Sequence, residues 1–246
     1  MIERWLLYNY AQPMSNNNLT GKLYVVATPI GNSGDISLRA IEVIGSVDAV
    51  ICEERKEGSK LLRQLGLQKP LIELNEHNEN DIIQDILIEL INGKSYALIS
   101  DGGTPLFNDP GRQLIKLIHD GGIPVSPVPG VASLTAAISV CPFDLDQFLF
   151  LGFLPPKTDA RERALSRHTS VDLPIILMDT PYRMGKLLDE VSKAFGKNQT
   201  IFLACDLTLP TEALYLGSVQ DVLAQVKNRK AEFILILDKP ERRRRY

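Results

Sequence analysis

The residues best suited to chemistry stand in a loop rich in glycine and proline that runs from Ser100 to Gly111. An apolar run, Tyr96–Ile99, precedes the loop and has the composition of a strand buried on both faces. Gly102 and Gly103 lack the side chain that would keep a ligand away from the main chain. In open α/β sheets, ligands bind at the carboxyl ends of strands. The loop therefore indicates a site for a small organic cofactor; the alternative is a plain strand-to-helix turn in which Asp101 caps the helix.

Two further loops have a similar character. Residues 28–32 (T-P-I-G-N) end a β-type run, and after them Ser37 or Asp35 can cap a helix that begins near Leu38. Residues 129–130 (P-G) are followed by small residues that let a helix start close to a ligand. Each loop is a weak signal alone, but their order and spacing form a set. No G-x-G-x-x-G precedes a helix and no G-K-[ST] loop occurs, which disfavours a nicotinamide-binding domain and a nucleotide phosphate loop.

The composition limits the class of protein. The 246 residues are 44% apolar, with a net charge of −3 and an isoelectric point near 5.7. A chain of this length buries a large core, and no apolar run reaches the ~20 residues that a membrane helix needs. The acidic balance argues against a broadly basic RNA-binding surface but not against a local one. Two groups of basic residues stand out. One is the run of arginines at 242–245, and the other is formed by Arg55, Lys56, Lys60 and Arg63. The second group can also be the solvated face of a helix.

The cysteines indicate the redox compartment. Cys52, Cys141 and Cys205 are an odd number without the spacing of metal ligands. Each lies in or beside an apolar run, so we expect buried thiols in a reducing cytoplasm and no bound metal. The first residues do not form a convincing export signal because their apolar part is short. We therefore expect a cytoplasmic protein without membrane association.

The periodicity predicts two α/β domains. In the first domain, expected strands alternate with expected helices, which is typical of a mostly parallel sheet. The expected strands are at 22–27, 49–52, around 72, 96–99 and 124–128, and the expected helices are at 37–44, 58–65, 80–91 and 111–119. In the second, we expect helices at 131–140, 187–194 and 219–226, strands at 148–154, 174–178, 200–204 and 232–237, and antiparallel pairs. The predicted division is a flexible N-terminal extension (1–20), an N-terminal α/β domain (21–128), a C-terminal α/β domain (129–240) and a basic tail (241–246).

With these motifs in view, the chain resembles the tetrapyrrole methylase superfamily. The T-P-I-G-N loop at 28–32, the Ser100–Gly111 loop and Pro129-Gly130 correspond to the family wordings T-P-I-G-N, S-D-A-G-T-P-L-I-S-D-P-G and P-G-P-S. Residues 148–155 (F-L-F-L-G-F-L-P) and 180–183 (T-P-Y-R, where the family usually has S-P-H-R) extend the likeness. It covers roughly residues 21 to 238 and is nearest to the branch of ribosomal RNA small-subunit ribose 2′-O-methyltransferases.

The resemblance implies a fold, a cofactor and a set of binding residues. Two α/β domains of the tetrapyrrole methylase type would hold S-adenosylmethionine in the cleft between them, and the family suggests a homodimer. Exposed main chain at the glycine loops would hold the amino acid part and the adenine edge of the cofactor. The expected cofactor-binding residues are Ile30, Gly31, Asp101, Gly102, Gly103, Thr104, Pro105, Ser133, Met178, Asp179, Pro181 and Ala204; simple core packing is the alternative for Met178.

The substrate side departs from the family wording. Residues 53–62 read E-E-R-K-E-G-S-K-L-L where the family commonly has E-D-T-R-H-T-G-K-L-L, so Glu53 and Lys60 match and Glu54 keeps a carboxylate. A ribose hydroxyl becomes a good nucleophile only when its proton leaves, so a positioned base assists methyl transfer. The candidates for this base are Glu53, Glu54 and Asp35, with His77 weaker, and Glu54 can instead be an N-cap or the partner of Lys56 or Arg183. Candidate substrate-binding residues are Arg55, Lys56, Lys60 and Arg183.

Three functions therefore stand beside one another. The first is an S-adenosylmethionine-dependent methyltransferase that acts on a ribose 2′-hydroxyl of small-subunit ribosomal RNA, with that RNA or the small subunit as partner. The second is a methylase of a corrin precursor, although the chain lacks the G-x-G-P-G-D start typical of that branch. The third is a binding module that keeps the cofactor site but has lost turnover, which the altered segment at 55–58 would explain.

Overall fold

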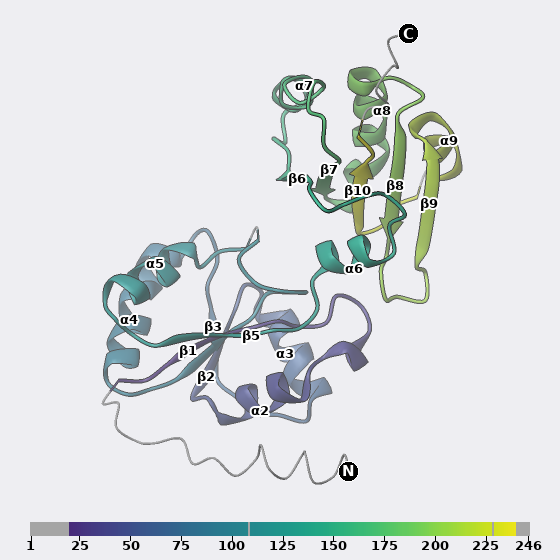
Figure 1. Cartoon of the computed structure of the whole chain (residues 1–246). Helices are drawn as coiled ribbons and strands as arrows, with labels where there is room; N and C mark the ends of the chain where they lie inside the picture. Colours follow the sequence, from purple (N-terminus) through teal and green to yellow (C-terminus); the bar gives the residue numbers. More distant parts are fainter. Residues whose placement is uncertain (1–19, 108, 228, 240–246) are drawn as a thin grey trace.

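The computed structural model describes residues 20–107, 109–227 and 229–239, which form two sheets that lie one after the other along the chain (Figure 1). The predicted flexible extension, apart from residue 20, and the predicted basic tail lie outside the described residues. The strands of the first sheet fall within residues 23–128 and those of the second within 149–237. The predicted boundary at 128/129 lies in the connection between the two sheets and stays a prediction.

The first sheet is wholly parallel, as the alternation of its segments predicted. Its strand order is β3-β2-β4-β1-β5, which places β1 and β4 in the interior of the sheet. Because the strands are parallel, all their carboxyl ends lie along one edge, where the three glycine-containing loops begin. The bounds are β1 Leu23–Val26, β2 Ala49–Cys52, β3 Leu71–Glu73, β4 Tyr96–Leu98 and β5 Val125–Val128.

Helices cover both faces of the first sheet and make a three-layer sandwich (Figure 1). On one face pack α4 (Glu79–Ile91) and α5 (Arg112–Asp120). On the other face pack α2 (Leu38–Ser46) and α3 (Arg55–Gln64). The side chain of Ser37 caps α2 by accepting a hydrogen bond from the Ala40 N–H. Of the two predicted caps, Ser37 and Asp35, it is therefore Ser37 that caps this helix.

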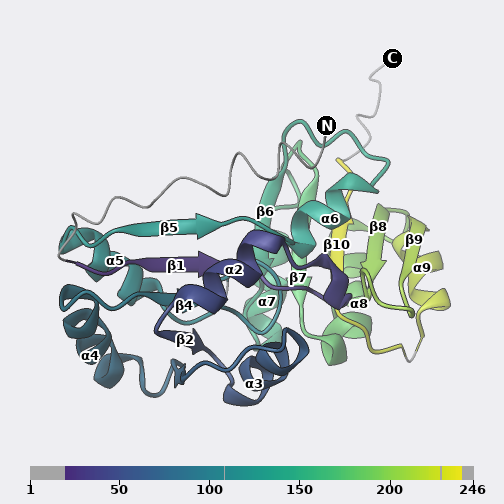
Figure 2. The same ribbon diagram turned by 90° about the horizontal axis from the view of Figure 1, so that it is seen from below.

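The second sheet is mixed, which confirms the expected antiparallel pairs. Its order is β6-β7-β10-β8-β9, with β6 and β7 parallel and the other neighbours antiparallel. The bounds are β6 Leu149–Phe153, β7 Ile175–Asp179, β8 Thr200–Cys205, β9 Ala213–Ser218 and β10 Phe233–Leu237. The short helix α6 (Ser133–Ser139) packs on one face of this sheet, close to the connection from the first sheet (Figure 2).

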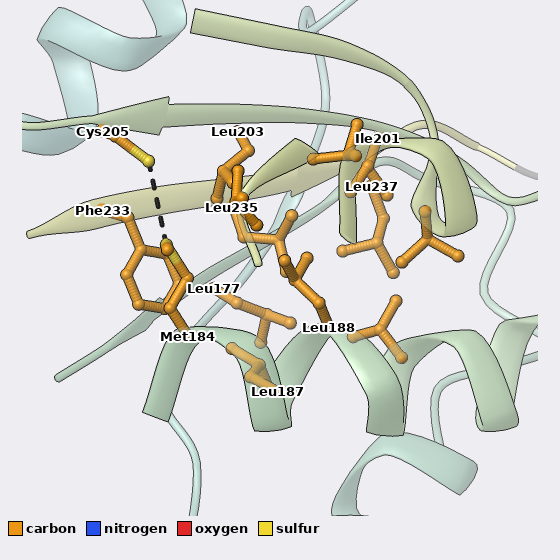
Figure 3. Close-up of a cluster of buried hydrophobic side chains, with 14 of the residues drawn as sticks. Leu177, Met184, Leu187, Leu188, Ile201, Leu203, Cys205, Phe233, Leu235 and Leu237 are labelled. Carbon is orange, nitrogen blue, oxygen red and sulfur yellow. Dashed lines mark hydrogen bonds between the residues drawn. The ribbon is translucent and has the colours of Figure 1, made fainter. Parts of the chain in front are cut away.

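Three helices build the main core on the opposite face of the second sheet. They are α7 (Thr158–Ser166), α8 (Met184–Phe195) and α9 (Val219–Gln225). Figure 3 shows the leucines of α8 directed at the strands and the Cys205 sulfur facing that of Met184. The two sulfur atoms are 3.8 Å apart.

The buried cysteines are not reactive. Burial raises the pKa of the Cys205 thiol to about 11, and that of the buried Cys52 also to about 11, so neither is a reactive thiolate at neutral pH. Cys141 is only half-buried, so the expectation that all three thiols are buried holds for Cys52 and Cys205 but not fully for Cys141.

The expected segments occur, with bounds shifted by up to three residues, and two elements were missed. Helix α3 begins at Arg55, three residues before the predicted start, and Gly58 within it packs so closely on β2 that a Cβ would lie 2.9 Å from the Cys52 sulfur. The sequence analysis missed α7 and β9. Residues 213–216 of β9 read A-L-Y-L and are apolar, yet β9 is an edge strand that exposes Leu214 and Leu216.

A buried ion pair fastens α7 to α8. The Arg161 guanidinium donates to both carboxylate oxygens of Glu190, at 2.5 and 2.7 Å, and the two residues are 1% and 2% exposed. The same guanidinium donates to the carbonyl oxygens of Pro155 and Pro156, at 3.1 and 2.8 Å. These bonds fix the chain that follows β6, and with it Phe153 at the end of that strand.

We expect Glu190→Gln to lower the free energy of unfolding by about 3–5 kcal/mol, because it leaves the charge of Arg161 buried without its partner. Urea denaturation followed by circular dichroism measures the loss. The neighbouring pair Lys193–Asp189 on α8 is exposed, so Asp189→Asn is the control and changes stability by at most about 1 kcal/mol. Equal losses in the two variants would contradict the structural role given to Arg161 and Glu190.

Candidate functional site

A cavity of about 370 Å³ lies between the two sheets, and we call it the central cavity. The first sheet contributes the loops after its strands, with Ile30, Asp101, Gly102, Asp109 and Ser133 in the lining. The second sheet contributes the ends of β6, β7 and β8, the start of β10 and the segment after β8. The volume lies within the range typical of pockets for small molecules and cofactors.

The register of the second sheet explains which of its residues meet at the cavity. Asp179 at the end of β7 pairs with Phe233 at the start of β10, and Phe233 pairs with Cys205 at the end of β8. One residue further in, the second row of the lining is formed by Met178, Ile234 and Ala204. Antiparallel pairing thus brings β7, β8 and β10, which are distant from one another in the sequence, to one edge of the sheet.

The structure brings seven of the twelve predicted cofactor-binding residues to the central cavity. They are Ile30, Asp101, Gly102, Ser133, Met178, Asp179 and Ala204. Gly103 and Thr104 line a smaller adjoining pocket of about 200 Å³ that shares Gly102, Asp109, Ser133, Phe153 and Met178 with it. Gly31 lines a neighbouring pocket against α3 (the α3 pocket), while Pro105 and Pro181 do not line the central cavity.

Main-chain bonds tie the three predicted loops to one another. Thr28 and Gly103 exchange two backbone hydrogen bonds, at 2.9 and 3.0 Å, as an isolated antiparallel bridge. The Thr104 hydroxyl donates to the Val131 carbonyl oxygen at 3.0 Å. The backbone N–H and carbonyl of Gly103 are therefore used within the protein, and its φ of +88° suits glycine. Gly103 braces the loops, whereas Gly102 offers free main chain to the cavity.

The lining is rich in carboxylates, three of which the sequence analysis did not select, namely Asp109, Asp206 and Glu232. Burial is the main cause that raises the pKa of Asp101, Asp109 and Glu232. Asp109 lay within the motif that was quoted, but the Leu207–Leu209 segment and Glu232 carry no motif. Only the pairing of β8 with β10 brings these last two together.

These carboxylates differ in how their charge is balanced. Asp206 pairs with Arg229 at 2.8 Å, and Asp179 pairs with Arg183 at 2.5 Å. Within residues 20–239, leaving aside positions 108 and 228, neither Asp101, Asp109 nor Glu232 has an ion-pair partner. The lining therefore has an excess of negative charge in a partly buried place, which favours a cationic ligand over an anionic one.

Asp179 also carries an unused hydrogen-bonding atom. Its Oδ1 accepts from the Thr180 N–H at 2.7 Å and from Arg183 Nε at 2.6 Å. Its Oδ2 is buried and has no partner among the described residues, and the same holds for the Thr180 hydroxyl. A buried polar atom without a partner is costly, so this carboxylate oxygen at the cavity wall is suited to a donor group of a ligand.

Strained backbone occurs at two loops beside the central cavity. In the part of the chain that the structure describes, the non-glycine residues with positive φ are Leu106 (76°), Asp206 (51°) and Thr208 (68°). The Asp109 carboxylate holds the first by accepting from the Leu106 N–H at 2.8 Å. Such strain persists only where surrounding contacts impose it, and it concentrates at functional sites. Its position agrees with a site between the sheets.

The predicted bases occupy different surroundings. Glu53 and Glu54 follow β2 and line a pocket of about 460 Å³ with Arg55, Lys56 and His77, which we call the Glu53 pocket. Asp35 is exposed on the short 3₁₀-helix η1 (Ser33–Asp35) and lines neither this pocket nor the central cavity.

The Glu53 carboxyl group has a raised pKa. Burial is the largest cause, and together with the charges of Asp101 and Asp109 it raises the pKa to about 7. Because these two aspartates line the central cavity, the electrostatic coupling connects Glu53 to that cavity. The Glu54 N–H donates to the Asp101 carboxylate, which fixes the turn after β2 to the loop after β4.

The structure decides whether Asp101 and Glu54 act as helix caps or ion-pair partners. Asp101 does not cap a helix, because α5 begins at Arg112 after Gly111, so that alternative was wrong. Glu54 occupies the N-cap position of α3 but makes no side-chain cap bond, and Arg183 pairs with Asp179 instead.

The predicted substrate-binding cations lie around these pockets. Arg55 and Lys56 are exposed beside the Glu53 pocket, and Arg55 donates to the Leu71 carbonyl oxygen at 3.0 Å. Lys60 lines the α3 pocket and pairs with Glu57 at 3.2 Å. Arg183 lies on the 3₁₀-helix η2 (Pro181–Arg183), directly after β7.

Other features of the described residues bear on the site. A shallow depression of about 650 Å³ between α3 and β3, the α3–β3 depression, contains none of the predicted cofactor-binding residues. No group of three or more His, Cys, Asp or Glu side chains in the described part of the chain is arranged to hold a metal ion. None of the helices described there combines the length and apolar character needed to cross a membrane.

Comparison with known proteins gives relatives along most of the chain. A protein in Xylella fastidiosa named ribosomal RNA small subunit methyltransferase I is 37% identical over 221 residues, which is 88% of this chain and 81% of the relative. Proteins of the same name in Leptospira biflexa and Escherichia coli O157:H7 are each 36% identical, covering 89% and 92% of this chain and 91% and 81% of the relatives.

Solved structures share the fold. Uroporphyrin-III-C-methyltransferase from Thermus thermophilus superposes with a TM-score of 0.61 at 21% identity, covering 89% of this chain and 94% of that one. Diphthine synthase superposes with a TM-score of 0.71 at 15% identity, covering 89% of each chain. The model of the family described as tetrapyrrole (corrin/porphyrin) methylases matches residues 22–223. The chain therefore belongs to the tetrapyrrole methylase family and is a methyltransferase.

Proposed function

We propose that this methyltransferase uses S-adenosylmethionine to methylate a ribose 2′-hydroxyl of small-subunit ribosomal RNA. The observation that carries the cofactor assignment is the central cavity, which joins free main chain at Gly102 to carboxylates without cationic partners. Support for the substrate comes from the relatives at 36–37% identity, whose names state small-subunit ribosomal RNA. The solved structures, at 15–21% identity, concern the fold alone and do not favour a tetrapyrrole substrate.

The residues of the central cavity fit this cofactor by chemical type. The sulfonium and amino groups are cationic and suit a lining that contains Asp101, Asp109 and Glu232. The free Oδ2 of Asp179 can accept from a hydroxyl or amino group. Apolar contacts for the adenine and for the methylene groups of the methionine part are available from Ile30, Met178, Ala204, Leu207 and Ile234. Gly31, Gly103, Thr104, Pro105 and Pro181 would act indirectly, by shaping the loops.

When bound, the cofactor supplies an electrophilic methyl group, and the protein's task is to align the acceptor oxygen with it. Alignment of this kind can be worth up to ~7–11 kcal/mol. Glu53 is our choice for the base that takes the hydroxyl proton, because its pKa of about 7 leaves a large carboxylate fraction at neutral pH. Glu54 and Asp35 lack this combination of burial and coupling to the cavity and are weaker choices.

The charge distribution separates the two ligands. The acidic lining of the central cavity repels phosphate, whereas α3 presents Arg55, Lys56 and Lys60 beside the two neighbouring pockets. We propose that the RNA backbone lies along α3 and that the reacting ribose enters from this side. The local basic group makes RNA binding compatible with a net charge of −3.

A homodimer in a reducing cytoplasm is also proposed. The family resemblance suggests the dimer, and the exposed Leu214 and Leu216 on the edge strand β9 offer an apolar surface for it. The compartment is supported by the three free cysteines.

Purified protein should transfer a labelled methyl group from S-adenosylmethionine to small-subunit ribosomal RNA, as a transcript or in assembled subunits. Alkali-resistant dinucleotides with mass analysis would locate the group on a ribose. Tetrapyrrole precursors, followed by absorption, are the comparison substrate. Methylation of the tetrapyrrole alone, or tight cofactor binding without transfer to any acceptor, would contradict the proposal.

Gly31→Ala should weaken cofactor binding roughly 10-fold or more, by separating the two walls of the central cavity. A Cβ at this position would lie 2.8 Å from both Leu209 Cγ and Thr208 Oγ1 and 3.0 Å from the Leu207 carbonyl oxygen. Such overpacking typically costs about 1–3 kcal/mol. Calorimetry measures the affinity. Gly66→Ala is not a suitable control, because Gly66 has a φ of +67° and an alanine there would be strained.

Gly185→Ala is the matched control for Gly31→Ala, because a Cβ there meets no atom within 4 Å and the residue lies on the exposed side of α8. It should bind the cofactor as the unmodified protein does. An unchanged affinity in Gly31→Ala would show that the walls of the cavity are not held by the contact at Gly31.

The rate of methyl transfer should rise with pH through about 7 and then level off. Below this pH the Glu53 carboxyl is protonated and cannot accept the proton of the substrate; above it, the carboxylate is available. Glu53→Gln should lower kcat about 10²-fold or more and abolish this limb of the profile, and Glu54→Gln should keep it. If Glu53→Gln retained the same pH profile, another group would have to be the base.

A further inference from the structure

An exposed aromatic side chain stands where the second sheet meets the central cavity. Tyr182 is 69% exposed, although it follows β7, whose last residue, Asp179, lines the cavity. Three residues of chain span at most about 11 Å, so the main chain of Tyr182 lies close to the cavity wall at Asp179. With so little of its surface buried, Tyr182 contributes little to the core.

The neighbouring arginine is held in place from the cavity wall. Arg183 donates through Nε to Asp179 Oδ1 at 2.6 Å and pairs with it through Nη2 at 2.5 Å. The Asp179 side chain is fully buried, whereas that of Arg183 is 18% exposed. Two bonds to a buried carboxylate fix the guanidinium, and its centre lies 5.8 Å from the centre of the Tyr182 ring.

A second cation strengthens the positive charge of this rim. Lys186, one helical turn after Tyr182, is exposed on α8 and donates to the Thr158 hydroxyl of α7 at 2.5 Å. An exposed aromatic ring beside a guanidinium group, with an exposed lysine on the helix that follows, matches the chemistry of an unstacked nucleobase with its phosphate. Proteins bind exposed bases by stacking them on aromatic side chains and on arginine planes.

We propose that Tyr182 and Arg183 form a platform on which a base of the RNA substrate, next to the nucleotide that is methylated, stacks. The inference rests on the proposed function, because it takes RNA as the substrate. Asp179 then has two roles: its Oδ1 orients Arg183 toward the RNA, and its Oδ2 faces the cofactor side of the wall. Tyr182 replaces the histidine usual in the family wording and keeps a ring at this position.

Three variants of Tyr182 test the platform. Stacking one base is worth ~1–3 kcal/mol, so Tyr182→Ala should raise the Kd for a small-subunit ribosomal RNA transcript, and the KM for its methylation, about 5- to 150-fold. Tyr182→Phe should bind as the unmodified protein does, since it keeps the ring. In both variants, the affinity for S-adenosylmethionine should be unchanged.

A spectroscopic readout separates stacking from a structural role. Trp5 is the one tryptophan of the chain, so Tyr182→Trp combined with Trp5→Phe has a single fluorophore at the platform. Stacking on a base should quench its fluorescence as the transcript is added. Leu38→Ala is the control variant, because Leu38 is 66% exposed on α2 and should be silent in every assay.

The proposal is overturned if Tyr182→Ala binds and methylates the transcript as the unmodified protein does. It is also overturned if Tyr182→Phe loses as much as Tyr182→Ala, because the hydroxyl would then make the contact, or if the tryptophan is not quenched. Failure of the proposed function looks different, since the unmodified protein would then transfer no methyl group to RNA at all.

Discussion

The close packing of the Gly31 main chain against the Leu207–Leu209 segment is the contact on which the site depends. The loop after β1 meets the Leu207–Leu209 segment with no room for a side chain, and the Asn32 N–H donates to the Thr208 hydroxyl at 3.0 Å. On another side of the central cavity, the Phe107 and Phe150 rings meet edge to face, with centroids 6.1 Å apart. These contacts join two sheets of different topology, and the cavity exists only because they meet.

Backbone strain lies close to these contacts. Thr208 and Leu106 hold positive φ angles, and Glu212 and Asp109 accept hydrogen bonds from their N–H groups, at 2.8 Å each. Such strain persists only where the surrounding contacts impose it. The two loops are therefore held in place by the same part of the molecule that forms the central cavity.

The sequence predicted the parts of the site that local chemistry controls. Gly102 and Asp101 were selected because they directly follow a buried strand, at the edge where ligands bind in open α/β sheets. Asp206 and Glu232 were missed because only the pairing of β8 with β10 brings them to the cavity, and no local pattern records that pairing. Gly103 lines a pocket that adjoins the central cavity, but its main chain is bonded to Thr28, a contact between segments seventy-five residues apart. The edge strand β9 was missed although residues 213–216 are apolar, and its two exposed leucines become evident only from its place at the edge of the sheet.

We expect the cofactor to bind in the central cavity, against the main chain of Gly102 and carboxylates without ion-pair partners among the described residues. A crystal structure of the protein with S-adenosylmethionine decides this. The cofactor should lie between the two sheets, in contact with Gly102 on one wall and Met178 on the other. A cofactor bound in the α3–β3 depression, or on the outer face of either sheet, would contradict it.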